Sequence, residues 1–411
     1  MKKAASILVT VAMTLTLFSG CGTKAPTSSA SAKLSGKIVF ETHRTDMADT
    51  TLKAIAKEFT DANPGTTIEI EGVKDPDSTI KTRMAADEMP DICQVLTTVK
   101  QSDFSKYFAP IDSLGFNKDN FYYVVNGQGP DGKLYALTDG VTYGGGITYN
   151  VAVFKAAGID KVPTTMDEFM AACAKIKAKG VVPFASNFKD KWPLSGYDPG
   201  FGTLINGDVA YKNKLADSDK FLEGDGLKGM EFLKTMKDKG YLEPDLMSTN
   251  WDGFKKDMAQ GKVAMTFLGS WVNPQIIQNG ANAADIGWFT FPGATIYTLG
   301  ADTMYGVAAH SKNLPLAKAF FKYLYSEGRI SIATDMVPGN KNLTTLPAIA
   351  KTVKDSGVKI VEGIAQADAY TNLINKAQID TAAIVQEYLT AKDPTTVVKK
   401  YNDLWATARK G

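Results

Sequence analysis

The sequence is poor in the residues that build metal centres and disulfide frameworks. Its 411 residues include only three Cys and two His. A zinc site and a disulfide-stapled fold both need several such residues close together, so this scarcity argues against both and against most His-based catalysis. No phosphate loop, nucleophile elbow or His-Glu-x-x-His motif appears either. The sequence therefore predicts no metal, no cofactor and no enzyme activity.

The chain also lacks a charge imbalance. It has 46 Lys and Arg against 44 Asp and Glu, and Lys2 and Lys3 alone account for the excess. Phosphate affinity depends on clustered positive charge, so a formally neutral body argues against nucleic-acid binding. With 22% charged and 44% hydrophobic residues, the composition is that of a globular protein. The length suffices for about two to three domains.

The N-terminus has the pattern of an export signal. Two lysines precede a mostly apolar run over residues 4–18, and small residues then lead to Cys21. The run is shorter than the roughly 20 residues that a membrane span needs, and no second stretch reaches that length. Residues 1–20 are therefore predicted to be a signal peptide. Residues 21–36, rich in Ser, Thr, Ala and Lys, are predicted to be a flexible tether.

The end of this signal resembles a bacterial lipobox, Leu17-Phe18-Ser19-Gly20-Cys21. The resemblance implies that Cys21 becomes the lipid-modified first residue of the mature protein and anchors it to a membrane. An ordinary secretory signal with an incidental cysteine is the alternative. Export also allows a disulfide between Cys93 and Cys173. Each of them lies in an apolar segment, which favours two buried free thiols.

Strand and helix patterns alternate along the body. Residues 37–41, 67–71 and 92–96 have the composition of strands, and helical spacing covers residues 52–59 and 79–88 between them. This alternation is typical of a parallel α/β sheet.

Similar patterns continue towards the C-terminus. A capping box from Thr165 to Glu168 predicts the start of a helix that ends near Gly180. Residues 263–268 and 306–309 are expected to be strands. Further helices are expected over residues 227–239, 315–325, 365–390 and 395–408.

Three blocks of sequence occur in an order that is typical of one family. The first block contains Gly132-Lys133-Leu134-Tyr135-Ala136-Leu137, Gly145-Gly146-Ile147-Thr148-Tyr149-Asn150 and Pro163-Thr164-Thr165-Met166-Asp167-Glu168-Phe169. The second contains Phe254, Gly261-Lys262-Val263-Ala264-Met265 and Gly269-Ser270-Trp271. The third contains Ser311-Lys312-Asn313, Ala317-Lys318-Ala319-Phe320-Phe321 and Pro338-Gly339. Together they resemble the family 1 extracellular solute-binding proteins of ABC importers, which include maltose- and oligosaccharide-binding proteins. Met166 departs from the pattern, because a Trp commonly follows the Thr.

The resemblance implies an α/β fold of two lobes with a ligand cleft between them. Lobe one would comprise residues 37–143 and 293–338, and lobe two residues 147–290 and 341–411. The chain would cross between the lobes three times, and the first crossing would form a hinge near residues 139–146. The run of three glycines there suits a hinge, although a tight turn needs glycines for the same reason.

Polar residues follow two of the expected strands, where open α/β sheets bind their ligands. His43, Arg44 and Asp46 follow the first strand, and Thr97 and Thr98 follow the third. Sugar hydroxyls both donate and accept hydrogen bonds, so they suit the planar groups of Asp and Arg. These five residues are predicted to bind ligand. The alternative is a solvated loop in which an Asp caps the next helix.

Two further residues are predicted to face the cleft. Asp302 precedes a strand at a place where the resemblance implies ligand contact, and a plain turn residue is the alternative. Tyr143 lies at the first crossing.

Aromatic rings are the other requirement of a sugar site, because a flat ring buries the apolar face of a pyranose. Trp271 follows an expected strand and matches the cleft aromatic of the family. The segment Trp192-Pro193-Leu194 resembles a segment of the maltose-binding proteins, and Phe188 lies nearby. These three residues are predicted to stack on sugar. The other tryptophans are expected to pack in the core, namely Trp251, Trp288 and Trp405.

One glycine pattern is discounted. Gly224-Asp225-Gly226-Leu227-Lys228-Gly229 fits the spacing of a dinucleotide fingerprint, but the charged residues 217–223 precede it where a strand is required. A loop entering a helix is predicted instead.

The combined expectation is a lipid-anchored extracellular protein that captures a carbohydrate, in particular an oligosaccharide, and delivers it to an ABC permease by hinge closure. It is expected to be a monomer on the outer face of the cytoplasmic membrane, which is the periplasmic side if an outer membrane exists. Two alternatives stay open. One is a sensor or a binding protein for a peptide, polyamine or organic anion. The other is a secreted carbohydrate-active enzyme, which needs two carboxylates at the scissile bond.

Overall fold

The structure is a computed structural model that describes residues 33–410 except 249 and 348. The predictions for the signal peptide, for Cys21 and for most of the tether lie outside the described residues.

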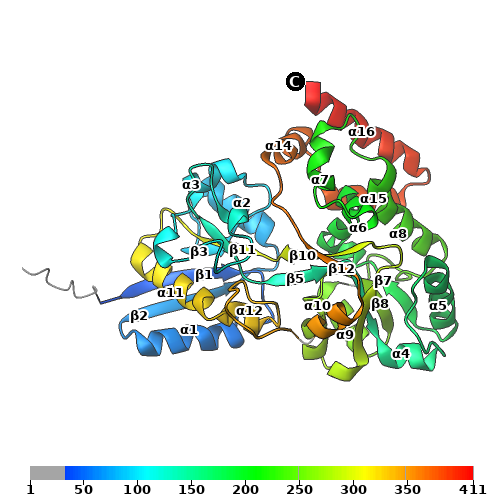
Figure 1. The fold of residues 1–411 in the computed structure, drawn as a ribbon, viewed down its shortest axis with the longest axis horizontal. Coiled ribbons are helices and arrows are strands. Elements are labelled where there is room, and N and C mark those ends of the chain that lie inside the picture. The colour runs from blue at the N-terminus through cyan, green and yellow to red at the C-terminus, as the bar shows by residue number, and fades with distance from the viewer. Residues whose placement is uncertain (1–32, 249, 348, 411) are drawn as a thin grey trace, which may run out of the picture. The chain divides into compact units, whose positions relative to one another are not determined.

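A five-stranded sheet is built from the first alternating segments of the chain (Figure 1). β1 (Gly36–Thr42) pairs in parallel with β2 (Thr66–Gly72) and with β3 (Ile92–Gln94). β11 (Met304–Val307) runs antiparallel between β3 and β4 (Ala136–Thr138). The three strands from which a parallel sheet was predicted are therefore parallel, and β11 adds an antiparallel strand between β3 and β4. β11 follows directly on another strand instead of a crossover helix, so it enters the sheet in the opposite direction.

A four-stranded sheet has the order β7-β8-β6-β9. β7 (Val182–Ala185) and β8 (Val263–Phe267) are parallel, whereas β6 (Gly146–Asn150) is antiparallel to β8 and to β9 (Ile286–Thr290). Every residue of β8 is buried, which explains its continuous apolar sequence.

A three-stranded sheet lies between the other two (Figure 1). Its central strand β10 (Ile296–Ala301) pairs with β5 (Val141–Gly144) on one side and with β12 (Lys359–Glu362) on the other. β5 is joined to β6 through Gly145 alone, so the chain passes here from one sheet to another. The hinge predicted near residues 139–146 falls on this link, and its movement stays a prediction.

The link contains Gly144, Gly145 and Gly146, and a side chain at any of them would strain the backbone or collide with a neighbour. Gly145 has φ +98°, in the left-handed region that side chains disfavour. A Cβ on Gly146 would overlap the indole of Trp288, and one on Gly144 would lie 2.6 Å from Thr298 Oγ1. The link is therefore tightly packed on both sides.

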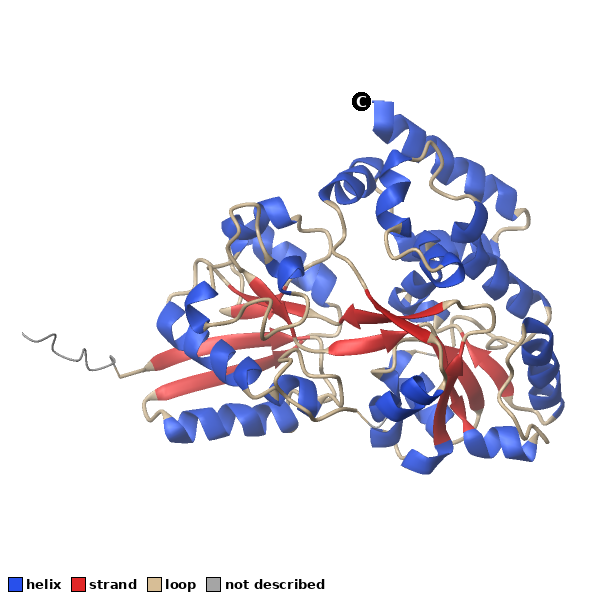
Figure 2. Cartoon of the chain, in the orientation of Figure 1, coloured by secondary structure: helices blue, strands red, loops and turns tan. Residues whose placement is uncertain are grey.

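Helices cover the sheets on the outside (Figure 2), with α1 against β2 and α11 against β1. The α-helices of the described residues are α1 (Thr51–Ala62), α2 (Pro76–Ala86), α3 (Phe104–Tyr107), α4 (Val151–Ala156), α5 (Met166–Ala178), α6 (Gly202–Asn206), α7 (Tyr211–Lys214), α8 (Lys228–Asp238), α9 (Trp251–Ala259), α10 (Val272–Gln278), α11 (Leu314–Ser326), α12 (Arg329–Ala333), α13 (Ile349–Asp355), α14 (Asp368–Ala377), α15 (Thr381–Thr390) and α16 (Pro394–Lys410). None of these helices is long and apolar enough to cross a membrane.

The capping box forms as predicted, and one predicted helix is wrong. Thr165 Oγ1 accepts from the backbone N–H of Glu168, whose carboxylate accepts from the backbone of Thr165 in return. The single helix expected over residues 365–390 is divided into α14 and α15. Gln378 adopts a left-handed conformation, and Asp380 caps α15 by accepting two of its first backbone N–H groups.

Two large apolar cores give the molecule two lobes. Lobe one is built on the five-stranded sheet, with Phe40 and Phe320 at its centre. Lobe two is built on the four-stranded sheet, with Phe184 at its centre. Cys93 and Cys173 are buried free thiols, as predicted. Burial raises the pKa of Cys173 to about 12, so its thiol stays protonated.

Candidate functional site

The loop after β1 is organised by a paired Arg and Asp. Arg44 donates from Nε and Nη2 to the two carboxylate oxygens of Asp46, at 2.9 and 2.7 Å. The Arg44 side chain is only 9% exposed, and its backbone N–H donates to Thr42 Oγ1 at the end of β1. Two parallel hydrogen bonds fix both side chains in one orientation. The alternative that an Asp of this loop caps the next helix does not hold, because the N-cap residue of α1 is Thr50 and no side chain forms a capping hydrogen bond there.

Two carboxyls, a buried one of Asp139 and a half-buried one of Asp302, come from the turns that flank the three-stranded sheet. The backbone N–H of Asp302 donates to Gly140, and that of Asp139 donates to Thr303, at 3.0 and 2.8 Å. Burial raises the pKa of both carboxyls, and the charge of Arg44 opposes this. Asp139 is 1% exposed, and its Oδ1 accepts no hydrogen bond from the described residues. Such a buried acceptor costs about 1–3 kcal/mol, which a ligand donor would recover.

We call Arg44, Asp46, Asp139 and Asp302 the carboxylate cluster. Arg44, Asp46 and Asp302 are residues that the sequence predicted for the site, whereas Asp139 was not predicted. Its position at the end of the strand over residues 136–138, immediately before the crossing, is the signal that predicts it.

His43 adds a neutral ring beside this cluster. Its Nδ1 lies 3.0 Å from the hydroxyl of Tyr305, which also lies 3.0 Å from Thr42 Oγ1. Burial, with help from the nearby charge of Arg44, lowers the pKa of His43 to about 4. The imidazole is therefore uncharged at neutral pH.

Three tryptophans from distant segments meet on lobe two. The ring centroids of Trp192 lie 4.9 Å from Trp251 and 5.7 Å from Trp271, and those of Trp251 and Trp271 are 5.7 Å apart. Trp192 is 43% exposed, and the other two are half-buried. We call these residues the tryptophan cluster. Trp251 packs against the buried Phe254 as expected and also joins this cluster, and Trp288 and Trp405 are buried as predicted.

Local structure positions each ring of this cluster. Trp192 begins the short helix η5 (Trp192–Tyr197), which is anchored by the buried Leu194. Trp251 begins α9, and its backbone N–H donates to the carboxylate of Asp190. Trp271 directly precedes α10, after the turn that follows β8. Because all three rings stand at helix starts, rigid backbone holds the platform.

Lys255 links the two clusters electrostatically. Its ammonium lies 5.3 Å from the ring centroid of Trp251 and 3.2 Å from the carboxylate of Asp252. Burial raises the pKa of Asp46, but hydrogen bonding to Arg44 and the charges of Arg44 and Lys255 outweigh it, so the net shift is downward. The positive charge of Lys255 on lobe two therefore helps to lower the pKa of Asp46 on lobe one.

The three-stranded sheet supplies the floor between the clusters. Thr142 Oγ1 lies 3.0 Å from Ser270 Oγ, next to Trp271. Thr142 is paired with Gly300, and a Cβ on Gly300 would meet nothing within 4 Å. The floor is therefore open above this glycine.

Tyr143 lies on the opposite face of the same sheet, which corrects the prediction that it faces the cleft. It is 8% exposed and packs in an apolar group with Val141, Trp288 and Tyr297. Successive side chains of a strand point to opposite faces, so Thr142 takes the open face and Tyr143 the packed one.

Three other predicted residues lie apart from the clusters. Phe188 is 7% exposed within the core of lobe two, so it offers no stacking face, which corrects that prediction. Thr97 and Thr98 are exposed after β3. Asn375 Nδ2 donates to the carbonyl of Thr98 at 3.4 Å.

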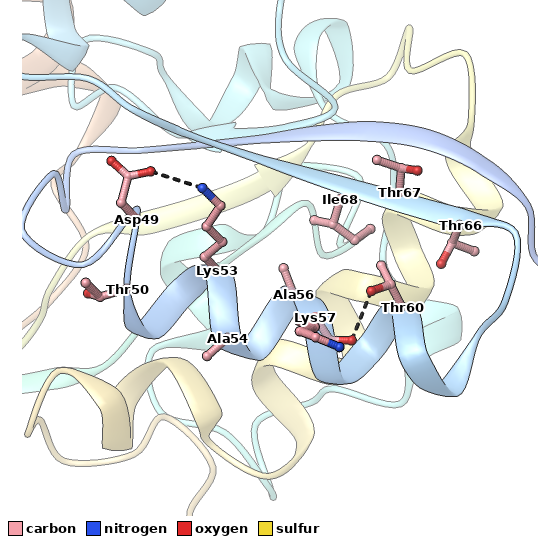
Figure 3. A pocket seen from close by; sticks show the side chains of 10 residues that line it. All are labelled: Asp49, Thr50, Lys53, Ala54, Ala56, Lys57, Thr60, Thr66, Thr67 and Ile68. Atoms are coloured by element: carbon pink, nitrogen blue, oxygen red, sulfur yellow. Dashed lines mark hydrogen bonds and ion pairs between the residues drawn. The ribbon is translucent and has the colours of Figure 1, made fainter.

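A surface depression lies elsewhere, between α1 and β2 of lobe one (Figure 3). It measures about 560 Å³, and its charged side chains pair with neighbours close in sequence, such as Lys53 with Asp49 at 3.4 Å. The buried Thr66, which also lines it, donates its hydroxyl to the carbonyl of Asn63. Across the described residues, no group of three or more His, Cys, Asp or Glu side chains is arranged to hold a metal ion.

Comparisons with known proteins agree with this architecture. A family model described as bacterial extracellular solute-binding protein matches residues 44–329. The multiple sugar-binding protein of Streptococcus mutans is 29% identical over 340 residues, which cover 78% of each chain. Two solved structures from Bifidobacterium animalis subsp. lactis are similar with TM-scores of 0.80. One is a binding protein of an ABC transporter in complex with mannobiose, at 23% identity over 92% of this chain and 95% of that chain. The other is a manno-oligosaccharide specific solute-binding protein in complex with mannotriose, at 24% identity with the same coverage.

Proposed function

The chain belongs to the bacterial extracellular solute-binding protein family, and we propose from this premise that it captures an oligosaccharide for an ABC importer. The observation that carries the proposal is the pairing of the carboxylate cluster with the tryptophan cluster across an open floor. Relatives named for sugar binding and the sugar complexes of similar structures support the same ligand class.

The two clusters match the two surfaces of a pyranose. Hydroxyls around the ring edge donate to carboxylates and accept from guanidinium or ammonium groups, as Asp139, Arg44 and Lys255 require. The apolar C–H face of the ring covers an indole, as Trp271 and Trp192 require. An organic anion satisfies neither the carboxylates nor the indoles, whereas the relatives and similar structures named for sugars favour a sugar over a peptide or polyamine.

Closure of the lobes is the proposed mechanism. Asn375 of lobe two bonds to Thr98 of lobe one, and Lys74 of lobe one lies 3.5 Å from Asp252 of lobe two. These exposed contacts are weak, each worth roughly 0–1 kcal/mol. A sugar that touches both clusters therefore supplies most of the preference for the closed state.

The extracellular location follows from the family, and the anchor is a further proposal. We propose that Cys21 is lipid-modified and holds a monomer at the outer face of the cytoplasmic membrane, where it docks onto the permease. A Cys21→Ala variant should appear in the soluble fraction instead of the membrane fraction. Unchanged membrane association would exclude this anchor.

We also propose that no bond is cleaved. Asp139 and Asp302 are two carboxyls with raised pKa in one site, which is the feature that would favour a glycosidase. Oligosaccharides incubated with the protein should be recovered unchanged by thin-layer chromatography. Appearance of shorter products would establish hydrolysis instead.

Isothermal titration against mannobiose, mannotriose, raffinose, stachyose and diacetylchitobiose tests the binding proposal. At least one of these sugars should bind saturably, and Asp139→Asn should weaken it about tenfold, because one carboxylate acceptor is lost. Asp49→Asn, with its side chain 90% exposed, is the matched control and should leave affinity unchanged. Absence of binding by every sugar would refute the proposal.

A further inference from the structure

A second, smaller pocket lies at the lobe-two end of the three-stranded sheet. It measures about 220 Å³ and is walled by α6, α7, β10 and the segment after β12. α6 and β10 are in direct contact, and Figure 1 shows them side by side with β12. The volume exceeds the ~30 Å³ of one water and is smaller than the ~300 Å³ at which pockets for whole drug-sized ligands begin. It therefore suits one ring-sized group.

The pocket opens on the same face of the sheet as the candidate site. Thr298 lines the pocket and is two residues from Gly300 along β10, so both point to one face. Gly300 is paired with Thr142, which lies beside Trp271. The open strip above Gly300 thus connects the two sites.

The walls of the pocket combine polar and aliphatic groups without net charge. Lys212 lies 3.2 Å from the carboxylate of Asp198, which is buried, so the two charges compensate each other. Thr203 and Thr298 contribute hydroxyls. Val209 and Ile364 contribute apolar surface, and Ile364 is 48% exposed, which is unusual for so large an apolar side chain.

The pocket is also preformed. Asn213 on α7 donates to the carbonyl of Ala365 and accepts from the backbone N–H of Ala367, each at 2.9 Å. Gly363 donates to the carbonyl of Leu299 at 2.9 Å. These bonds fix the segment after β12 against both α7 and β10, so little ordering is needed when a ligand enters.

We propose that this pocket binds an additional sugar unit of an oligosaccharide whose other units lie between the carboxylate and tryptophan clusters. The inference rests on the proposed function and extends it by naming a ligand longer than the main site alone accommodates. One face of the added ring covers Ile364 and Val209, while its hydroxyls bond to Thr298, Thr203 and Lys212. The pocket thus selects for chain length.

The test compares sugars that differ by one unit, using calorimetry on the full chain. Mannotriose is compared with mannobiose, and stachyose with raffinose. The longer member of the bound pair should bind at least about tenfold tighter. Ile364→Ala and Thr298→Val should each lower this ratio about threefold and leave the affinity of the shorter sugar unchanged. Ile360→Ala is the matched control, because Ile360 is 42% exposed on β12, just before the segment that holds Ile364, and is paired with Tyr297, whose side chain lies on the opposite face of the sheet from Thr298.

The outcomes separate the two proposals. If no sugar binds, both fail. If sugars bind but the longer members bind no tighter, the pocket is not a sugar subsite and the proposed function stands. An equal loss for both members of a pair in Ile364→Ala, or the same loss in Ile360→Ala, would likewise overturn the subsite.

Discussion

The carboxylate cluster and the tryptophan cluster form the two sides of the candidate site, and different interactions hold each of them in place. The carboxylate cluster on lobe one and the adjoining turns is held by charge and by directed hydrogen bonds, with Arg44 nearly buried between acidic groups. The tryptophan cluster on lobe two is held by contacts between uncharged aromatic rings, and its Trp192 is 43% exposed. The side chains of the carboxylate cluster are therefore held in place before a ligand binds, whereas the tryptophan cluster offers a broad contact area.

This difference assigns different tasks to the lobes. Hydrogen bonds to charged groups are directional, so the carboxylate cluster determines which hydroxyls of a sugar are accepted. Stacking tolerates rotation of the sugar on the ring, so the tryptophan cluster contributes affinity with less discrimination. Changes in the carboxylate cluster should therefore affect folding as well as binding, and changes in the tryptophan cluster should affect binding alone.

The largest expected effect comes from Arg44→Met. The change leaves Asp46, Asp139 and Asp302 without their compensating cation, and the free energy of unfolding should fall by about 3 kcal/mol. Urea denaturation measures this. Lys57→Met removes an exposed pair with Asp61 and should cost no more than about 0.5 kcal/mol. An equal loss of unfolding free energy in Arg44→Met and Lys57→Met would show that the carboxylate cluster does not stabilise the fold more than an exposed ion pair does.

Trp271→Ala should have the next largest effect, and on binding. Loss of one stacking face should weaken the bound sugar about thirtyfold, or ~2 kcal/mol, as for a central contact residue. The half-buried ring should contribute little to unfolding. Trp405→Phe is the control, because it alters a fully buried ring of the lobe-two core and should lower stability without changing affinity. A Trp271→Ala variant that loses stability but keeps affinity would contradict the proposed division.

The smallest effect concerns pH and lobe one. The pKa of His43 is lowered from 6.5 to about 4, so the unfolded chain binds a proton between these values that the folded chain does not. Stability from neutral His43 is therefore complete above about pH 6.5 and is lost as the pH falls towards 4. Wild type should lose about 1 kcal/mol more than His43→Asn between pH 7 and pH 5.5. The exposed His310 provides the control, since His310→Asn should follow wild type. Identical pH profiles for wild type and His43→Asn would show that His43 is not held neutral.

The sequence predicted the local elements well where one periodicity dominates. The strands near Phe40 and Ile68, the helix begun by the capping box at Thr165 and the buried state of both described cysteines follow from side-chain pattern alone. The helix broken at Gln378 was missed, because a left-handed residue other than Gly carries no strong signal. The direction of β11 was missed because strand pattern is the same in both directions.

The candidate site divides in the same way. Residues that follow strands, such as Arg44, Asp46 and Asp302, were found because the ends of strands in α/β sheets are recognisable. Asp139 and Lys255 were missed, because their significance lies in an unpaired oxygen and in a neighbour on the other lobe. Tyr143 was misplaced, because only strand register decides which face a side chain takes.

The sequence by itself determined that the protein is neutral, poor in metal-binding and disulfide-forming residues, and built from α/β units, because composition and periodicity are properties of the chain alone. Tertiary structure decided which of five tryptophans meet, which carboxylate keeps a free acceptor and where a second pocket opens. These features depend on contacts between residues far apart in the chain, and such contacts exist only when the sheets and their helices are assembled.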